Sequence, residues 1–71
     1  MPVVGTKVII DDKYPGYILK VFPPNEYHSG RFIVRIHYKY YTEEREFWFS
    51  DYGVTVKEVY QKVRNISNER I

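Results

Sequence analysis

Apolar and polar residues alternate with a period of two along about the first fifty residues, and this pattern constrains the fold more than any other feature. Successive side chains of a β-strand point to opposite faces, so a strand over residues 31–38 separates into two sets. One set is apolar and predicted for the core: Phe32, Val34, Ile36 and Tyr38. The other set is predicted to be mostly solvated: Arg31, Ile33, Arg35 and His37.

Three further strands are expected, at Thr6–Ile10, Tyr17–Phe22 and Glu44–Ser50. In the first strand Val8 and Ile10 share a face, and in the second Tyr17, Leu19 and Val21 alternate against Ile18, Lys20 and Phe22. In the last, Phe47 and Phe49 continue the core face, opposite Glu46, Trp48 and Ser50.

Turn residues separate these segments. The segment Asp11–Gly16 predicts a turn after the first strand, with a type II turn at Pro15-Gly16, because proline presets φ and glycine accepts a positive φ. Pro23-Pro24 ends the second strand, since proline cannot donate to the ladder. Asp51-Tyr52-Gly53 follows the last strand. Four strands joined in this way predict a mainly β chain, a meander that curls into a small barrel.

The last third of the chain has two interpretations. Thr55 to Glu58 matches a helix capping box, and Val56, Val59, Tyr60 and Val63 follow at helical spacing. These signals predict a helix from about Thr55 to Asn65, within a C-terminal helix or tail of about 56–71. Alternatively, a short fifth strand at Val54–Val56 closes the sheet edge before the helix begins.

The size of the chain limits its function. Seventy-one residues and 8.6 kDa indicate a single domain over 1–71. Without cysteine there is no disulfide, so aromatic residues, 18% of the chain, are expected to enlarge the core. A pocket that encloses a substrate is hard to build at this size, and we expect neither an enzyme nor a small-molecule substrate. With no signal peptide or membrane span visible, a cytoplasmic protein is expected.

The order of elements resembles that of the SH3-like barrels, the group that contains Tudor and KOW modules. Gly5 to Val8 leading into Tyr17, Leu19 and Val21 is similar to their opening hairpin, and Phe49 to Val54 to the helical turn before their last strand. The resemblance covers about Val4 to Val59 and implies an SH3-like barrel of four to five antiparallel strands, about 4–59. It departs from the proline-binding members, because only Trp48 is available for their paired tryptophans.

No catalytic or metal-binding pattern is present. Ser29, Ser50 and Ser67 lie in turns or near the end, without the surroundings of a nucleophile. His28 and His37 do not have the spacing of a metal site, and adjacent acids such as Asp11 and Asp12 usually face solvent. We therefore predict no catalytic residues, no metal and no cofactor.

Cations and aromatic rings alternate from Arg35 to Tyr41, along the end of the third strand and beyond it, and this is the only functional signal above background. The candidate binding residues are Arg35, His37, Lys39, Tyr40, Tyr41 and Trp48. Rings stack on bases while cations track phosphates, so a nucleic-acid-binding face is the preferred hypothesis. However, a net charge of only +2 and Glu43, Glu44 and Glu46 beside this face oppose it.

Three alternatives remain open for the same residues. The first is a protein–protein interaction module that docks through an exposed patch of Trp48, Tyr40, Tyr41 and Ile33. The second is a Tudor-like cage for a methylated cation, built from Tyr14, Tyr38, Trp48 and Tyr52. The third is purely structural, because cross-strand aromatic pairs stabilise small sheets.

Overall fold

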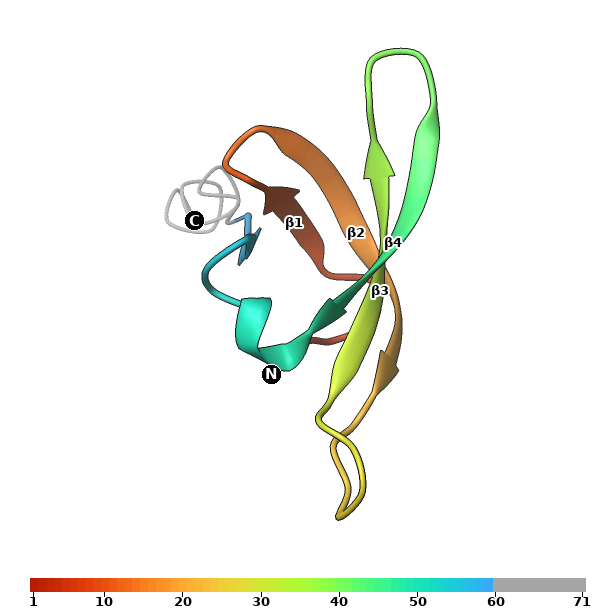
Figure 1. The fold of residues 1–71 in the computed structure, drawn as a ribbon. Helices are drawn as coiled ribbons and strands as arrows, with labels where there is room; N and C mark the ends of the chain where they lie inside the picture. The colour runs from red at the N-terminus through yellow and green to blue at the C-terminus, as the bar shows by residue number, and fades with distance from the viewer. Residues whose placement is uncertain (60–71) are drawn as a thin grey trace, which may run out of the picture.

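The computed structural model describes residues 1–59, and these form one antiparallel sheet of five strands in the order β4-β3-β2-β1-β5 (Figure 1). The strands are β1 (Lys7–Ile10), β2 (Tyr14–Phe22), β3 (Arg31–His37), β4 (Thr42–Trp48) and β5 (Val56–Glu58). A short 3-10 helix, η1 (Phe49–Asp51), follows β4. A mainly β chain is therefore confirmed.

The core lies on one face of this sheet, as the alternation in β3 predicts. Its buried members come from all five strands: Val8, Ile10, Ile18, Phe32, Val34, Ile36, Phe47 and Val56. Phe32 is central, because its ring lies 5.8 Å from the rings of Phe47 and Tyr52 and 6.3 Å from that of Phe49. It thereby joins β3 to β4 and to the segment around η1.

A β-bulge in β2 changes the expected alternation. Ile18 pairs with Val34 but Lys20 pairs with Ile33, so Leu19 is an extra residue in the ladder. As a result Ile18 is buried before the bulge and Val21 packs against the core after it. The expected grouping of Val21 with Tyr17 and Leu19 was wrong for this reason, since a bulge shifts the register by one residue.

The first turn lies within the predicted segment Asp11–Gly16, but at its beginning rather than at Pro15-Gly16. Asp11 and Asp12 both have φ of 56°, and the Lys13 N–H donates to the Ile10 carbonyl at 2.9 Å. Positive φ at both central residues, together with this hydrogen bond, is the pattern of a type I′ turn. The loop between β1 and β2 has three residues, because Ile10 pairs with Tyr14. The type II turn at Pro15-Gly16 was wrong, because both residues belong to β2, where Pro15 pairs with Ile9.

The two aspartates of this turn give a stability prediction. At a positive φ, a residue with a Cβ costs about 1–2 kcal/mol relative to glycine. We therefore expect Asp11→Ala to lower the free energy of unfolding by about 1 kcal/mol and Asp11→Gly to leave it equal or higher, since a short polar side chain tolerates this region better than alanine. Urea unfolding measures both variants, and equal destabilisation by both would contradict the turn type.

The fifth strand is present, but two residues later than Val54–Val56. Ile10 pairs with Val56 and Val8 with Glu58, so β5 extends the sheet beyond β1. The predicted helix start at Thr55 was wrong, because residues 56–58 are extended and their backbone pairs with β1. The rest of the predicted helix, from residue 60 onward, lies outside the described residues.

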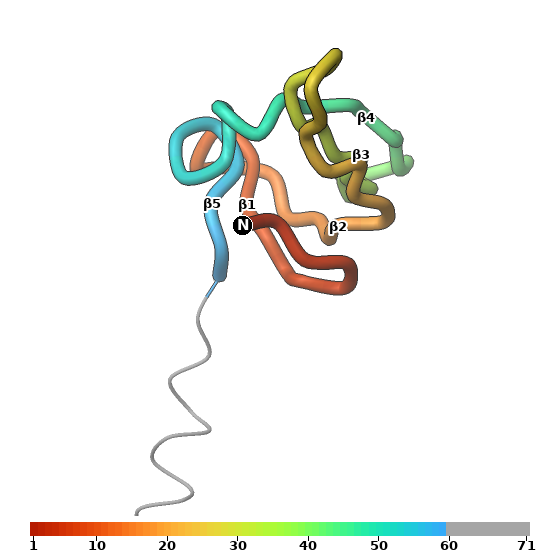
Figure 2. The backbone as a smooth tube through the Cα atoms, turned by 90° about the horizontal axis from the view of Figure 1, so that it is seen from below, coloured from red at the N-terminus to blue at the C-terminus, as the bar shows by residue number. Residues whose placement is uncertain are grey.

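The sheet is strongly curved but does not close into a barrel, so the closed form was wrong (Figure 2). β4 and β5 are its two edges, and η1 lies in the connection between them. On the inner face of β4 only Phe47 is buried, while Glu43 and Arg45, which pair with Ile36 and Val34, stay exposed. Charged side chains at an edge disfavour further strand pairing, which explains why this edge stays open.

Candidate docking surface

The strand register decides which of the candidate residues lie together. Arg35, His37 and Trp48 share the outer face of the sheet, since Trp48 pairs with Arg31 on β3 and lies opposite the core. However, His37 pairs with Thr42 at the other end of the hairpin. Arg31 and His37 are six residues apart, about 20 Å at ~3.4 Å per residue, so Trp48 is remote from His37.

Lys39, Tyr40 and Tyr41 lie in the β3–β4 hairpin turn. This turn and the β2–β3 loop (residues 23–30) project from opposite ends of the molecule (Figure 1). The six candidate residues therefore form two groups: the hairpin tip with His37 at one end, and Trp48 at the other. Arg35 lies between the two groups.

Two of the candidate residues on the outer face, Arg35 and His37, already contact neighbouring side chains of the sheet. Arg35 donates from Nη2 to Glu44 Oε2 at 2.7 Å, and this hydrogen bond raises the pKa of the guanidinium further above its usual value. His37 stacks on Tyr17 at 5.8 Å. Both therefore have a structural role on the sheet surface, and the charge of Arg35 is compensated.

At the hairpin tip, aromatic rings pack on one another. The ring of Tyr38 lies 4.9 Å from that of Tyr14 and 4.9 Å from that of Tyr41. Partial burial raises the pKa of the Tyr38 hydroxyl, with Arg45 opposing the shift. Lys39 lies over Tyr40 at 5.2 Å, and Tyr40 is 85% exposed.

These contacts do not form the cage considered for a methylated cation. Tyr14 and Tyr38 touch each other and leave no space for a cation between their rings. The other two expected members lie elsewhere, Tyr52 against Phe32 and Trp48 across from Arg31.

The charges of residues 1–59 cancel. Their eight cations are Lys7, Lys13, Lys20, Arg31, Arg35, Lys39, Arg45 and Lys57, and their eight anions are Asp11, Asp12, Glu26, Glu43, Glu44, Glu46, Asp51 and Glu58. The excess of +2 in the whole chain comes from the sequence of residues 60–71. Three of the cations are in ion pairs: Arg31 with Glu46, Arg35 with Glu44 and Lys57 with Asp12.

The structure brings Trp48 together with two residues that the sequence reasoning missed. Phe22 pairs with Arg31, and Arg31 pairs with Trp48, so the three form one row across β2, β3 and β4 on the outer face. We call them the aromatic–arginine row. The guanidinium of Arg31 lies over the Phe22 ring at 4.1 Å and donates from Nη1 to Glu46 Oε2 at 2.9 Å.

The row is exposed although it consists mostly of apolar rings. Phe22 is 37% and Trp48 54% exposed, and Tyr27 in the adjoining loop is 81% exposed. Its backbone is held in place, because the Phe49 N–H donates to the Gly30 carbonyl at 2.9 Å and the Trp48 N–H to Asp51 Oδ2 at 3.0 Å. A sequence signal was available for Phe22, since Pro23-Pro24 ends its strand and leaves it at the sheet margin.

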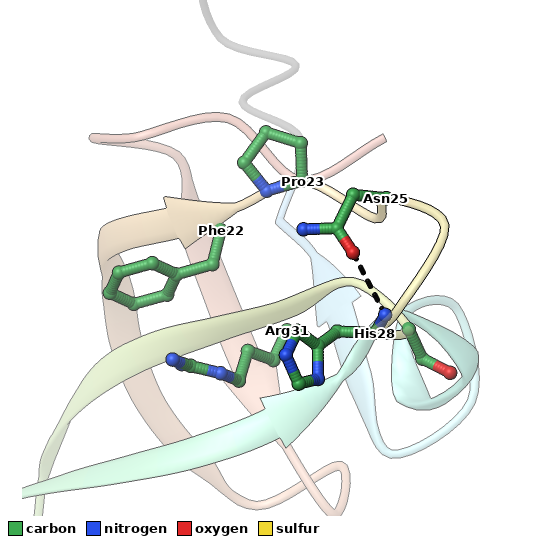
Figure 3. A pocket seen from close by; sticks show the side chains of 6 residues that line it. Phe22, Pro23, Asn25, His28 and Arg31 are labelled. Carbon is green, nitrogen blue, oxygen red and sulfur yellow. Dashed lines mark hydrogen bonds between the residues drawn. The ribbon is translucent and has the colours of Figure 1, made fainter.

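A pocket of about 370 Å³ adjoins the row at the β2–β3 loop, lined by Phe22, Pro23, Asn25, His28, Ser29 and Arg31 (Figure 3). A second pocket of about 320 Å³ lies beside the His37–Tyr17 stack and is bordered by Pro15 and Val59.

Within residues 1–59 no group of three His, Cys, Asp or Glu side chains is placed to hold a metal ion. The same residues contain no helix of the length and apolarity that crossing a membrane requires.

Comparison with protein-family models, with curated proteins and with solved structures gives no significant match for this chain.

Proposed function

We propose that this chain is a non-catalytic module that binds another protein through the aromatic–arginine row. The observation that carries this proposal is a guanidinium in line with two exposed rings, within residues 1–59, whose charges cancel. Trp, Tyr and Arg side chains dominate the binding energy of protein interfaces. Exposed Trp48 and Tyr27 and half-exposed Arg31 supply these three residue types at one end of the molecule.

Nucleic acid is the competing partner, and the hairpin tip favours it. Lys39, Tyr40 and Tyr41 are exposed together there, and rings beside cations suit single strands. A phosphate backbone is bound by several uncompensated cations in a row, and the outer face of the sheet does not provide such a row, because Arg31 and Arg35 each have a glutamate partner. The protein partner is therefore better supported.

The proposal includes the fold family of the chain, the SH3-like group. The strand order β4-β3-β2-β1-β5, with a helical turn before the last strand, supports membership of the SH3-like group. The open edge at β4 is a departure from its closed barrels.

Affinity capture with matched variants tests the proposed function. The full chain, Trp48→Ser and Tyr40→Ser are immobilised and exposed to lysate of the producing cell, with and without nuclease. We expect the wild type and Tyr40→Ser to retain one protein alike. Trp48→Ser should retain at least about tenfold less, because a truncated central ring costs about 2 kcal/mol or more.

Salt distinguishes the two partners. A protein held by apolar rings should remain bound between about 50 and 200 mM salt, whereas phosphate contacts weaken steeply over this range. Nuclease-sensitive retention that is lost in Tyr40→Ser and kept in Trp48→Ser would contradict the proposal and support nucleic acid at the hairpin tip.

A further inference from the structure

The pocket beside the aromatic–arginine row has two chemically different walls (Figure 3). Phe22 and Pro23 form the apolar wall, at the point where β2 ends. Asn25, His28, Ser29 and Arg31 form the polar wall, from the β2–β3 loop and the first residue of β3. A volume of about 370 Å³ is at the lower end of the range for ligand pockets, which suits one side chain or a chain end better than a large molecule.

Hydrogen-bond donors outnumber acceptors on the polar wall. Asn25 Oδ1 accepts from the backbone N–H groups of Tyr27 at 2.8 Å and His28 at 2.9 Å. Both of its ordinary acceptor positions are thus used, and only the Nδ2 donor is left. Because the turn depends on these bonds, the donor end of Asn25 is held in a fixed direction.

Arg31 adds a permanent positive charge to this wall. Nη1 donates to Glu46 and the flat face of the guanidinium lies over Phe22. Nε and Nη2 have no hydrogen-bond partner among residues 1–59, and the side chain is 38% exposed. Two donors of a guanidinium that is already oriented are therefore available to an acceptor from outside.

We propose that this pocket binds a carboxylate attached to a small apolar group. The proposal rests on the proposed function and names the partner's contact: an acidic side chain or chain terminus next to an apolar residue of the bound protein. The carboxylate would accept from Arg31 and Asn25, while the apolar group covers Phe22 and Pro23. Charge and hydrogen-bond complementarity both require an acceptor here, because a donor would leave these groups unpaired.

Three small probes test the proposal without knowledge of the partner. Phenylacetate has a ring and a carboxylate, phenylacetamide has the same shape without the charge, and acetate lacks the ring. Each is titrated into the ¹⁵N-labelled full chain, and amide shifts are followed by NMR. We expect phenylacetate to shift amides of residues 22–31 and to bind about tenfold more tightly than phenylacetamide, since loss of a charge-assisted hydrogen bond has this effect. Acetate should also bind more weakly than phenylacetate, because it lacks the ring that would cover Phe22 and Pro23.

The two cross-strand arginines provide a matched pair of variants. Arg31→Gln removes the charge at the pocket, and Arg35→Gln breaks the other exposed Arg–Glu pair between β3 and β4, that with Glu44. Both changes remove one exposed ion pair and should leave the fold intact. Phenylacetate binding should fall about tenfold in Arg31→Gln and remain unchanged in Arg35→Gln.

Absence of phenylacetate shifts at residues 22–31, equal binding of phenylacetamide, or equal loss in both arginine variants would each overturn the pocket proposal. The proposed docking function would survive such a result, because it depends on retention by the Trp48 and Tyr40 variants. Conversely, loss of docking would remove the protein partner while specific phenylacetate binding still supports a carboxylate site.

Discussion

Phe32→Ala is expected to remove most of the stability of this fold. The ring is fully buried and lies within 6.3 Å of the rings of Phe47, Phe49 and Tyr52. Truncation of a buried phenylalanine costs about 3–5 kcal/mol, and a chain of this size has about 4–10 kcal/mol in total. Urea unfolding and the dispersion of the amide spectrum measure the loss, which should leave a large unfolded fraction.

Trp48→Ala is the control for this prediction. The indole lies on the opposite face and is 54% exposed, so its removal should cost about 1 kcal/mol and leave a dispersed spectrum. If Trp48→Ala unfolded the chain while Phe32→Ala did not, the assignment of the two faces of β4 and β3 would be reversed. The aromatic–arginine row would then be part of the core rather than a surface.

The second large effect is expected at Gly16, where the backbone of β3 leaves no space for a side chain on β2. A Cβ there would lie 2.5 Å from the Arg35 carbonyl oxygen and 3.2 Å from Ile36 Cα. Both contacts are with backbone, so the strands would have to separate. Replacing a glycine inside a strand by alanine usually stabilises the fold. At Gly16 we expect the opposite, because of this clash: Gly16→Ala should lower the free energy of unfolding by about 2–3 kcal/mol.

Gly53→Ala separates this clash from the general effect of changing a glycine. Gly53 has φ of 88° and no atom within 4 Å of an added Cβ, so only the backbone conformation opposes alanine, at about 1 kcal/mol. Gly16→Ala should therefore be clearly the more destabilising of the two by urea unfolding. A neutral or stabilising Gly16→Ala would show that β2 and β3 are not paired as described.

The core strands were predictable because local pattern and tertiary packing agree there. Phe32, Val34 and Ile36 alternate with solvated residues, and all three are buried. The first turn was predicted in the right segment, Asp11–Gly16, but at the wrong residues within it, because Pro15-Gly16 has a strong turn signal of its own. Gly16 is required instead by the approach of the Arg35 carbonyl, a contact that no local pattern reports.

At the C-terminal end of the described chain, tertiary pairing overrides a local signal. Thr55 to Glu58 matches a capping box, yet Val56 is buried in the core and Lys57 pairs with Ile9 of β1. Local helix propensity is a weak preference, and the free edge of β1 offers a strand the alternative of a full ladder.

The outward orientation of Trp48 was predicted correctly, but its neighbours were not. Alternation assigns Arg35, His37 and Trp48 to one face, which the register confirms. Only the register shows that Trp48 lies in line with Arg31 and Phe22. Because the offset of paired strands depends on the length of the β3–β4 turn, period-two patterns alone leave it undetermined.

Site-specific photo-crosslinking tests the central claim, docking through the aromatic–arginine row, most directly. A benzophenone amino acid replaces Trp48 in one full-length variant and Tyr40 in another, and each is irradiated in the producing cell. We predict a protein adduct from position 48 that survives nuclease treatment, and none from position 40. A nucleic-acid adduct at position 40 with no protein adduct at position 48 would contradict the account.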